Sequence, residues 1–291
     1  MKKHLFTIII ILLIFESCST NYSTSSQSTY KRIVVIGQSA LNLLLELGLQ
    51  ERIVGIAYLE DVDSLKKYDN LPILTTGWLD KETILSLKPD LIFAMEAALR
   101  VDRIGNRVFW EKRGIKVFTM DDYKQDKSFV NYFKDIHSVG HLFDIQSRTD
   151  SFVVALQELR RKCAQQQLPC RRVLHLSHFS GNQFYYYPPS LCLLDEIIED
   201  CGSEYINWGN KSFIMPIETI LASNPDKIII TQFRKKKNPD FIDHLSKDRY
   251  LRHLPAVYNK KILEVNYTQS VRGTINMQEV YSDVANFLKY E

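Results

Sequence analysis

Aromatic and arginine side chains gather in the segments that follow short apolar runs of this chain. Aromatic rings stack on planar or bulky molecules, and the tyrosine hydroxyl adds a hydrogen-bonding group. Arginine pairs with anionic oxygens through a planar, two-pronged guanidinium group. Together these residue types predict the binding of a bulky small molecule that carries negative charge. The candidate ligand-binding residues are Tyr58, Trp78, Arg100, Tyr185, Tyr186, Arg234 and Arg272.

Some of these residues have a plainer interpretation. The loop of residues 177–189 is rich in aromatics, but its three tyrosines could simply cover the helix that follows. The lysine run of residues 235–237 is typical of a solvated surface. His137 and His141 have the i, i+4 spacing of two metal ligands on one helix face, yet no obvious third ligand accompanies them. We therefore predict no metal site and no resident cofactor.

Two glutamates occupy equivalent places in a repeated string. E-T-I-L-x-x-x-P-D-x-I occurs at residues 82–92 and again at residues 218–228. Glu82 and Glu218 each fall in the first turn of a predicted helix, where an acid meets the positive end of the helix dipole. The residue before each proline is disfavoured in a helix, so the helices are expected to end at Lys88 and Asn224. Simple stabilisation of the helix is the alternative to a functional role for either glutamate.

The elements around the repeat also occur twice in the same order. Each half opens with a basic residue and an apolar strand, continues with an apolar helix that a glycine ends, and reaches another apolar strand after the Pro-Asp pair. Unbroken apolar strands are typical of parallel sheets covered on both faces. The sequence thus predicts two doubly wound α/β lobes, with mainly parallel sheets flanked by helices. The matched segments are 32–36, 40–47 with Gly48, and 91–95 in one lobe, and 172–176, 191–201 with Gly202, and 228–231 in the other.

A long helix is expected between the lobes. Residues 147–167 carry apolar side chains at helical spacing, and twenty helical residues extend ~30 Å, which is about the diameter of a small domain. This helix would connect the two lobes as a stiff spine. The expected division is a signal peptide (1–17), a tether (18–30), an N-terminal lobe (31–125), a linking segment with the spine helix (126–169) and a C-terminal lobe (170–291).

The first residues have the pattern of an export signal. Lys2 and Lys3 precede an apolar run at residues 5–15, which suits a signal peptide and is too short for a permanent membrane helix. Ser17-Cys18 then resembles the lipobox of bacterial lipoproteins, in which the cysteine receives lipid. A plain secretory signal with an incidental cysteine is the alternative. The polar residues 19–29 read as a flexible tether.

Phe15 and Glu16 depart from the usual lipobox pattern. Without residues 1–17, the 37 basic and 34 acidic residues become 35 and 33, a net charge of about +2. Such a weak charge argues against a nucleic-acid partner.

Four cysteines remain if Cys18 carries lipid. Three pairings are conceivable in an oxidising compartment. Cys192 and Cys201 would lie ~13 Å apart along one predicted helix, which is too far for a bond. Cys163 with Cys170 is sterically feasible, and four free thiols are the alternative.

These residues resemble a known family. The resemblance begins with the segments 32–34, 43–49, 52–56 and 82–92, and continues through 194–207, 218–230, 254–257 and 260–262. It covers nearly all of the expected mature chain. The chain is similar to the helical-spine periplasmic binding proteins that supply ABC importers with iron siderophores, haem or cobalamin.

The resemblance implies how such a protein works. Members hold the ligand in a cleft between two lobes, and one glutamate on each lobe engages arginines of the permease. By motif position these are Glu82 and Glu218. The implied partners are an ABC permease and its ATPase, with a membrane anchor through Cys18. We expect a monomeric lipoprotein of the periplasm or cell envelope.

The resemblance also narrows the ligand. A ferric siderophore or haem is expected, because arginines can pair with catecholate oxygens or propionates. Cobalamin is the alternative, favoured by the aromatic loop and disfavoured by the arginines. An enzyme or cofactor-assembly scaffold with a nitrogenase-like two-lobed fold is the alternative from another class. The chain lacks a glycine-rich phosphate loop, a G-x-S-x-G elbow and an H-E-x-x-H motif.

Overall fold

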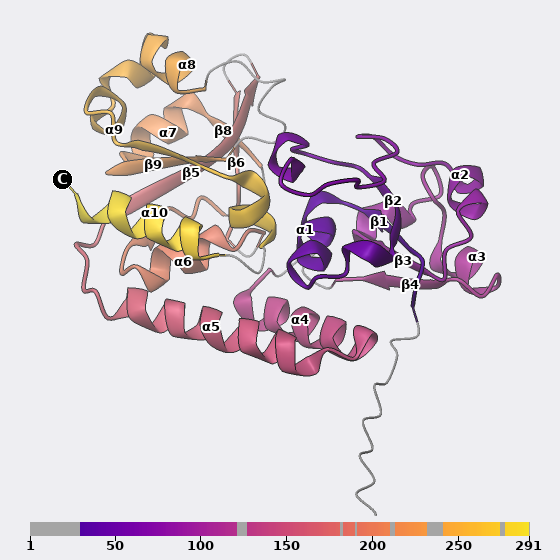
Figure 1. Ribbon diagram of the computed structural model, residues 1–291. Helices are drawn as coiled ribbons and strands as arrows, with labels where there is room; N and C mark the ends of the chain where they lie inside the picture. The colour runs from indigo at the N-terminus through magenta and orange to yellow at the C-terminus, as the bar shows by residue number, and fades with distance from the viewer. Residues whose placement is uncertain are drawn as a thin grey trace, which may run out of the picture.

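The molecule has two α/β lobes and a pair of helices that lies along one side of both. Figure 1 shows the N-terminal lobe on the right, the C-terminal lobe on the left and helices α4 and α5 beneath them. The computed structural model describes residues 30–120, 127–180, 183–189, 191–209, 213–231, 241–273 and 277–290.

The N-terminal lobe is built on a four-stranded parallel sheet with the order β2-β1-β3-β4. Its strands are β1 (Ile33–Ile36), β2 (Ile53–Ala57), β3 (Leu91–Ala94) and β4 (Lys116–Thr119). Its helices are α1 (Gln38–Glu46), α2 (Lys81–Ser86) and α3 (Arg107–Glu111).

Both faces of this sheet are buried. Along β1, Ile33 and Val35 join the core cluster that contains α1, whereas Val34 and Ile36 join a second cluster that contains Trp110 of α3. Successive side chains of a strand point to opposite faces, so a strand covered on both sides must be apolar throughout. The expectation of buried parallel strands is confirmed.

The C-terminal lobe has a mixed six-stranded sheet. The order is β10-β9-β5-β6-β8, and β7 also pairs with β5. Its strands are β5 (Arg172–Ser180), β6 (Gln183–Tyr186), β7 (Glu204–Tyr205), β8 (Ile214–Pro216), β9 (Lys227–Thr231) and β10 (Ile262–Val265). Its helices are α6 (Leu194–Asp200), α7 (Ile217–Ser223), α8 (Phe241–Lys247), α9 (Pro255–Tyr258) and α10 (Gln278–Lys289).

The predicted repetition is present in the topology. The parallel strands β7, β5, β9 and β10 have the same order as β2, β1, β3 and β4, and β6 and β8 are antiparallel additions. Gly48 and Gly202 follow α1 and α6 with φ of 66° and 76°, the left-handed conformation that favours glycine. Two doubly wound lobes therefore account for the duplicated sequence.

The Pro-Asp part of the repeat forms the same hydrogen bonds in each lobe. The Asp90 carboxylate accepts a bond from the Arg32 backbone N–H at 3.0 Å. The Arg32 guanidinium donates to the carbonyl of Leu87 at the end of α2, at 2.6 Å. This arrangement joins the end of one helix to the starts of two strands. The equivalent bonds in the C-terminal lobe join Asp226 to Arg172 at 2.8 Å and Arg172 to Ser223 at 2.8 Å.

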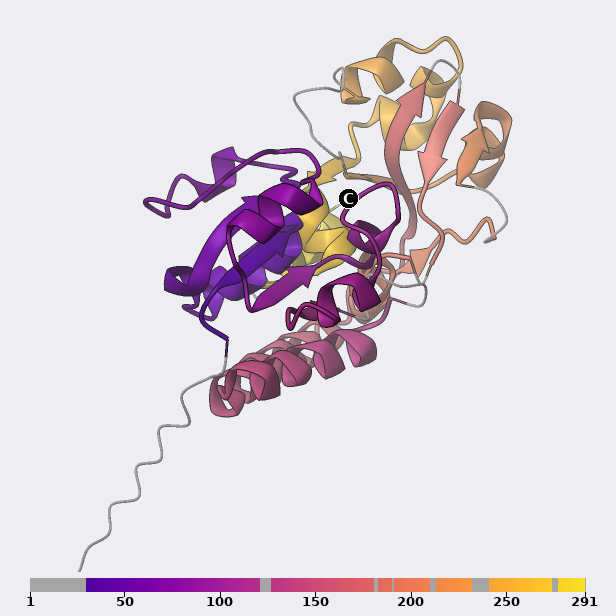
Figure 2. The ribbon, with the colours of Figure 1, turned by 90° about the vertical axis from the view of Figure 1, so that its right-hand side faces the viewer.

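The spine is a hairpin of two helices. The expected long helix is α5 (Gln146–Ala164), and α4 (Phe129–Phe143), which the sequence did not reveal, lies beside it (Figures 1 and 2). Asp144 reverses the chain between them in the left-handed conformation. Arg148 donates to the carbonyl of Leu47 in the N-terminal lobe, and the later turns of α5 pack on α6 and α10. Helix α5 thus contacts both lobes.

Gly140 sets the close approach of α4 to α5. A Cβ atom at this position would lie 2.2 Å from Thr149 Oγ1 and 3.3 Å from the backbone Cα of Gln146. We expect Gly140→Ala to lower the free energy of unfolding by about 1–2 kcal/mol, because overpacking outweighs the higher helix propensity of alanine. Urea unfolding measures this loss. A Gly140→Ala/Thr149→Ala double variant should recover part of it, and a fully stable single variant would contradict the argument.

Candidate functional site

A stack of two aromatic rings and a guanidinium group lies beyond the carboxyl ends of the N-terminal strands. Tyr58 directly follows β2, and its backbone N–H donates to the carbonyl of Gly77 at 2.8 Å. This bond brings two loops together, so the Tyr58 and Trp78 rings stack with centroids 3.8 Å apart. The Arg103 guanidinium lies 3.8 Å from the Trp78 ring centroid. Trp78 therefore contacts both a phenol and a cation, and all are beside the site expected for a ligand.

Tyr58 adopts an unfavourable backbone conformation to reach this stack. Its φ is 58°, a left-handed value that few non-glycine residues adopt. Such strained residues persist where the surrounding structure holds them, and they concentrate at binding sites. The half-buried side chains of Tyr58 and Trp78 are packed against the second core cluster. The structure thus brings together two of the residues selected from sequence.

The arginine at the stack is Arg103, whereas the sequence had favoured Arg100. Arg100 is exposed and pairs with Asp102, with Nε 3.0 Å from Oδ1. This hydrogen bond holds the pKa of the Asp102 carboxyl below its usual range. Arg103 instead donates to the carbonyl of Ala97 at 2.7 Å, which fixes its side chain beside Trp78. Arg103 comes three residues after the predicted Arg100, because the chain forms an irregular turn here that no sequence pattern predicts.

In the C-terminal lobe, the tyrosines of β6 alternate between surface and core. Tyr185 is half-buried, whereas Tyr186 is only 1% exposed and its hydroxyl accepts a bond from the Trp208 backbone N–H at 3.1 Å. Burial raises the pKa of Tyr186 to about 12. The structure therefore places Tyr186 in the lobe core and leaves Tyr185 accessible.

A second tyrosine pair packs within the C-terminal lobe against its core. The hydroxyls of Tyr187 and Tyr267 lie 2.8 Å apart, although the two residues belong to distant segments. Tyr267 follows β10, and Tyr187 follows β6. The sequence offered only the aromatic density of the loop as a signal for Tyr187. Its pairing with Tyr267 depends on the order of strands in the sheet.

The remaining arginine candidates stay predictions. Arg234 lies outside the described residues. The Arg272 backbone ends a short π-helical turn, Thr268–Arg272, and its side chain is outside the description.

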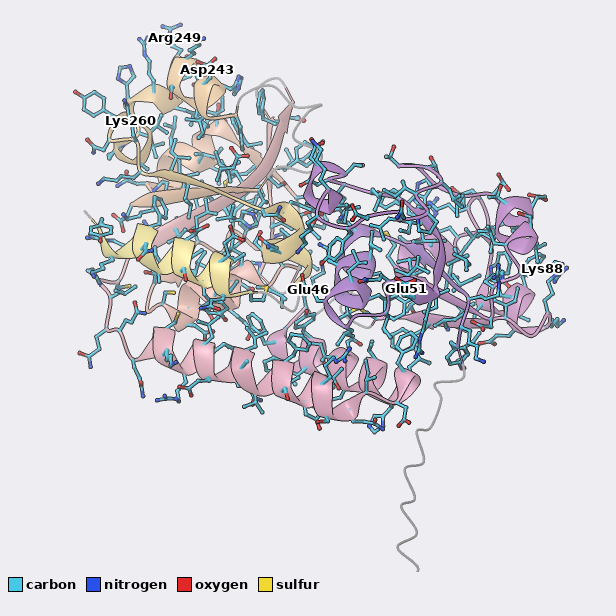
Figure 3. All side chains as sticks on the ribbon, in the orientation of Figure 1. Glu46, Glu51, Lys88, Asp243, Arg249 and Lys260 are labelled. Atoms are coloured by element: carbon cyan, nitrogen blue, oxygen red, sulfur yellow. The ribbon has the colours of Figure 1, made fainter. Side chains whose placement is uncertain are left out.

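The π-helical turn Thr268–Arg272 contacts the N-terminal lobe. Thr268 Oγ1 donates to Glu60 Oε2 at 2.6 Å. A polar cavity of about 170 Å³ lies at this junction, between residues that follow β1 and β2 and residues that follow β10. Glu46, labelled in Figure 3, lies on α1 between the lobes and contributes to its lining. The strand ends of the two lobes therefore meet here, at one border of the interlobe space.

Glu82 and Glu218 are exposed acids in the first turns of α2 and α7. The Asp80 carboxylate caps α2 by accepting a bond from the Thr83 backbone N–H at 2.6 Å, which lowers the pKa of Asp80. Helix α2 is thus already capped without Glu82. Figures 1 and 2 show α2 and α7 on the side of the molecule opposite to α4 and α5, one in each lobe.

The paired histidines connect the spine helices. His137 Nδ1 lies 3.0 Å from Asp150 Oδ1, and His141 Nδ1 lies 3.3 Å from Gln146 Nε2. Across the described ranges, no group of three or more His, Cys, Asp or Glu side chains is placed to hold a metal ion.

The sequence matches the family model described as "Periplasmic binding protein" over residues 33–266. The chain belongs to this family. It is also 22% identical over 247 residues to the uncharacterized ABC transporter substrate-binding lipoprotein YvrC of Bacillus subtilis (strain 168), covering 81% of this chain and 74% of that protein. The resemblance seen in the sequence is confirmed.

Solved structures share the fold of this binding protein. A periplasmic binding protein from Veillonella parvula DSM 2008 has a TM-score of 0.79 and 19% identity, covering 90% of this chain and 92% of its own. A possible iron-binding protein from Staphylococcus epidermidis ATCC 12228 has a TM-score of 0.72 and 22% identity, covering 90% of this chain and 99% of its own. The vitamin B12-binding protein BtuF of Vibrio cholerae has a TM-score of 0.63 and 20% identity, covering 89% of this chain and 97% of its own.

The binding protein is therefore a substrate-binding component of an ABC transporter. Its role requires a small-molecule ligand together with permease and ATPase subunits. Members of this family bind substrates and do not catalyse reactions. Within the part of the chain that the structure describes, no helix has the length and apolar character to cross a membrane. Cys18, the predicted lipidation site, lies outside that part.

Proposed function

We propose that this protein captures a chelated iron compound, a ferric siderophore or haem, in the cleft between its lobes. The contact of Trp78 with both Tyr58 and Arg103 carries this proposal. The rings offer a stacking surface for a planar or bulky chelate, and the guanidinium offers a charge for its anionic oxygens. Tyr185, which stays accessible on β6, is the proposed contact from the opposite lobe.

Delivery is proposed to occur at the membrane. Glu82 and Glu218 would engage basic side chains of the permease, one from each lobe. Cys18 would carry a lipid that holds a monomer at the cell envelope, with residues 19–29 as the tether. Both glutamates are exposed in the first turns of α2 and α7, and these two helices lie on the side of the molecule opposite to α4 and α5, which supports this arrangement.

Cobalamin is the second candidate ligand. The Tyr58–Trp78 ring pair favours it, because stacked rings can hold a large macrocycle without any charge pairing. Arg103 separates the two candidates: the loss of its charge should weaken an anionic iron chelate far more than a cobalamin.

Tryptophan quenching tests the ligand class. The purified mature domain is titrated with a ferric tris-catecholate, haemin and cyanocobalamin. Saturable quenching by an iron compound supports the proposal, quenching by cyanocobalamin alone supports the second candidate, and no response to any of the three would reject both.

Replacement of Arg103 should reveal the role of its charge. We expect Arg103→Met to weaken binding of the iron chelate by roughly 10- to 100-fold, since a hydrogen bond to a charged group contributes about 1.5–3 kcal/mol. Arg113→Met is the matched control, because Arg113 also lies over a ring, 3.7 Å from the Phe109 centroid, but beyond the carboxyl end of α3. Equal affinities of the two variants would contradict the assigned role.

A further inference from the structure

Two cysteines meet at the interface between the spine and the C-terminal lobe. Cys163 lies in the last turn of α5 and is 4% exposed. Cys201 directly follows α6 and is 1% exposed. Both side chains belong to one buried cluster where α5 packs on α6, and each thiol shifts the pKa of the other, lowering that of Cys163 and raising that of Cys201. This contact joins the end of α5 to the end of α6, two segments that are distant in the sequence.

An ion-pair network fixes the register of the two helices at this point. Arg160 precedes Cys163 by one turn on the same face of α5. Its guanidinium binds Asp200, the neighbour of Cys201, through two hydrogen bonds of 2.7 and 3.1 Å. Arg160 also pairs with Glu196 at 2.8 Å, and the Tyr281 hydroxyl of α10 donates to Asp200 at 2.8 Å. The network therefore holds Cys163 beside Cys201 independently of any bond between the sulfurs.

The other two cysteines are placed elsewhere. Cys170 is exposed in the loop after α5. Cys192 is buried beside His175 and Tyr205, with its sulfur 3.9 Å from His175 Nδ1 and 3.8 Å from the Tyr205 hydroxyl. The pairing of Cys163 with Cys170 that the sequence allowed is thus not the one that the packing of α5 on α6 favours.

We propose that Cys163 and Cys201 form a disulfide bond in the exported protein and so join the spine helix covalently to the C-terminal lobe. The proposal rests on the proposed function only in requiring export to an oxidising compartment. The bond would close a loop that runs from the last turn of α5 through β5, β6 and α6, and it would restrict movement of the C-terminal lobe on the spine.

The chemistry requires a disulfide-bearing oxidant, either a protein or a small molecule, acting as the chain folds. The thiolate of one cysteine of the pair attacks one sulfur of the oxidant and releases the other as a thiolate. The thiolate of the second cysteine then attacks the first one in the mixed disulfide, which forms the Cys163–Cys201 bond and releases the second oxidant sulfur. Two protein thiols lose two electrons and two protons, and the oxidant becomes a dithiol or two thiols.

Thiol counting tests the proposal. The full chain with Cys170→Ser and Cys192→Ser, secreted to an oxidising periplasm, leaves Cys163 and Cys201 as the cysteines of the mature domain beyond Cys18. We expect no thiol in that domain to react with maleimide under denaturing conditions, and two to react after dithiothreitol. Reduction should lower Tm by roughly 5–10 °C. The matched control, with Cys163→Ser and Cys201→Ser instead, should have two reactive thiols before reduction and a Tm that dithiothreitol does not change.

If the Cys170→Ser/Cys192→Ser variant is not secreted, the purified chain is refolded with glutathione disulfide instead. Two reactive thiols that persist in the first variant after such refolding would overturn the proposal. This readout requires no ligand, so the disulfide and the choice of ligand can fail separately.

Discussion

Replacement of both Glu82 and Glu218 by glutamine is expected to abolish import while ligand affinity stays unchanged. Each exposed acid would form a charge pair with the permease, and truncation of one partner of such a pair typically costs about 2–5 kcal/mol. The double variant should thus lower uptake by about 100-fold or more. Uptake of radiolabelled ligand by cells that carry the complete transporter measures this effect, and titration of the purified domain measures affinity.

Stability should be little changed in this variant. First-turn acids typically contribute about 0.3–1 kcal/mol to a helix, and Asp80 already caps α2. A matched control is Glu51→Gln/Glu199→Gln, which removes one exposed acid from the turn before β2 and one from α6. Wild-type uptake by the Glu82/Glu218 variant would reject docking, whereas a loss of ligand affinity would show that these acids support the site or the fold.

The second large effect concerns the buried His175. Its Nδ1 lies 2.9 Å from the Tyr205 hydroxyl, and its Nε2 lies 2.7 Å from Thr231 Oγ1. The Tyr205 hydroxyl donates its proton to the carbonyl of Tyr187, so it accepts the Nδ1 proton of a neutral imidazole. Burial lowers the pKa of His175 to about 3. The unprotonated form is therefore the one that this network accommodates.

This depressed pKa makes folding stability fall with acidification. The unfolded histidine, with a pKa of about 6.5, binds a proton before the folded one does, so stability decreases as pH drops below about 6.5 towards 3. By pH 5 the expected loss is about 2 kcal/mol relative to pH 7.

Urea unfolding of wild type and His175→Gln at pH 7, 6 and 5 tests the expectation. Glutamine keeps one donor and one acceptor without a titrating ring. The wild type should lose about 2 kcal/mol more than the variant between pH 7 and 5, and other titrating groups cancel in this difference. Parallel pH profiles would contradict the assignment to His175.

The elements near the repeat could be predicted because their signals are local. Proline excludes the preceding residue from a helix, and Asn224 does adopt the left-handed conformation at the end of α7. Gly48 and Gly202 occupy left-handed positions for the same kind of reason. Strands buried on both faces can be predicted from sequence because every residue in them must be apolar.

The candidate site was predicted only in part. Tyr58 and Trp78 meet as expected for residues in neighbouring loops at the ends of parallel strands. Arg103 was missed, and Tyr186 is in the core. A strand side chain faces core or surface according to its register with its neighbours, and β6 pairs with both β5 and β8.

By itself, the sequence determined two similarly built lobes, a connecting helix, the family and the position of one exposed acid on each lobe. These follow from backbone rules and from spacing along the chain, which need no knowledge of distant contacts. Only the tertiary structure decided that α4 doubles the spine, that Arg103 lies over Trp78 and that Cys163 meets Cys201. Each of these depends on packing between segments that are far apart in the chain, where no local preference specifies the partner.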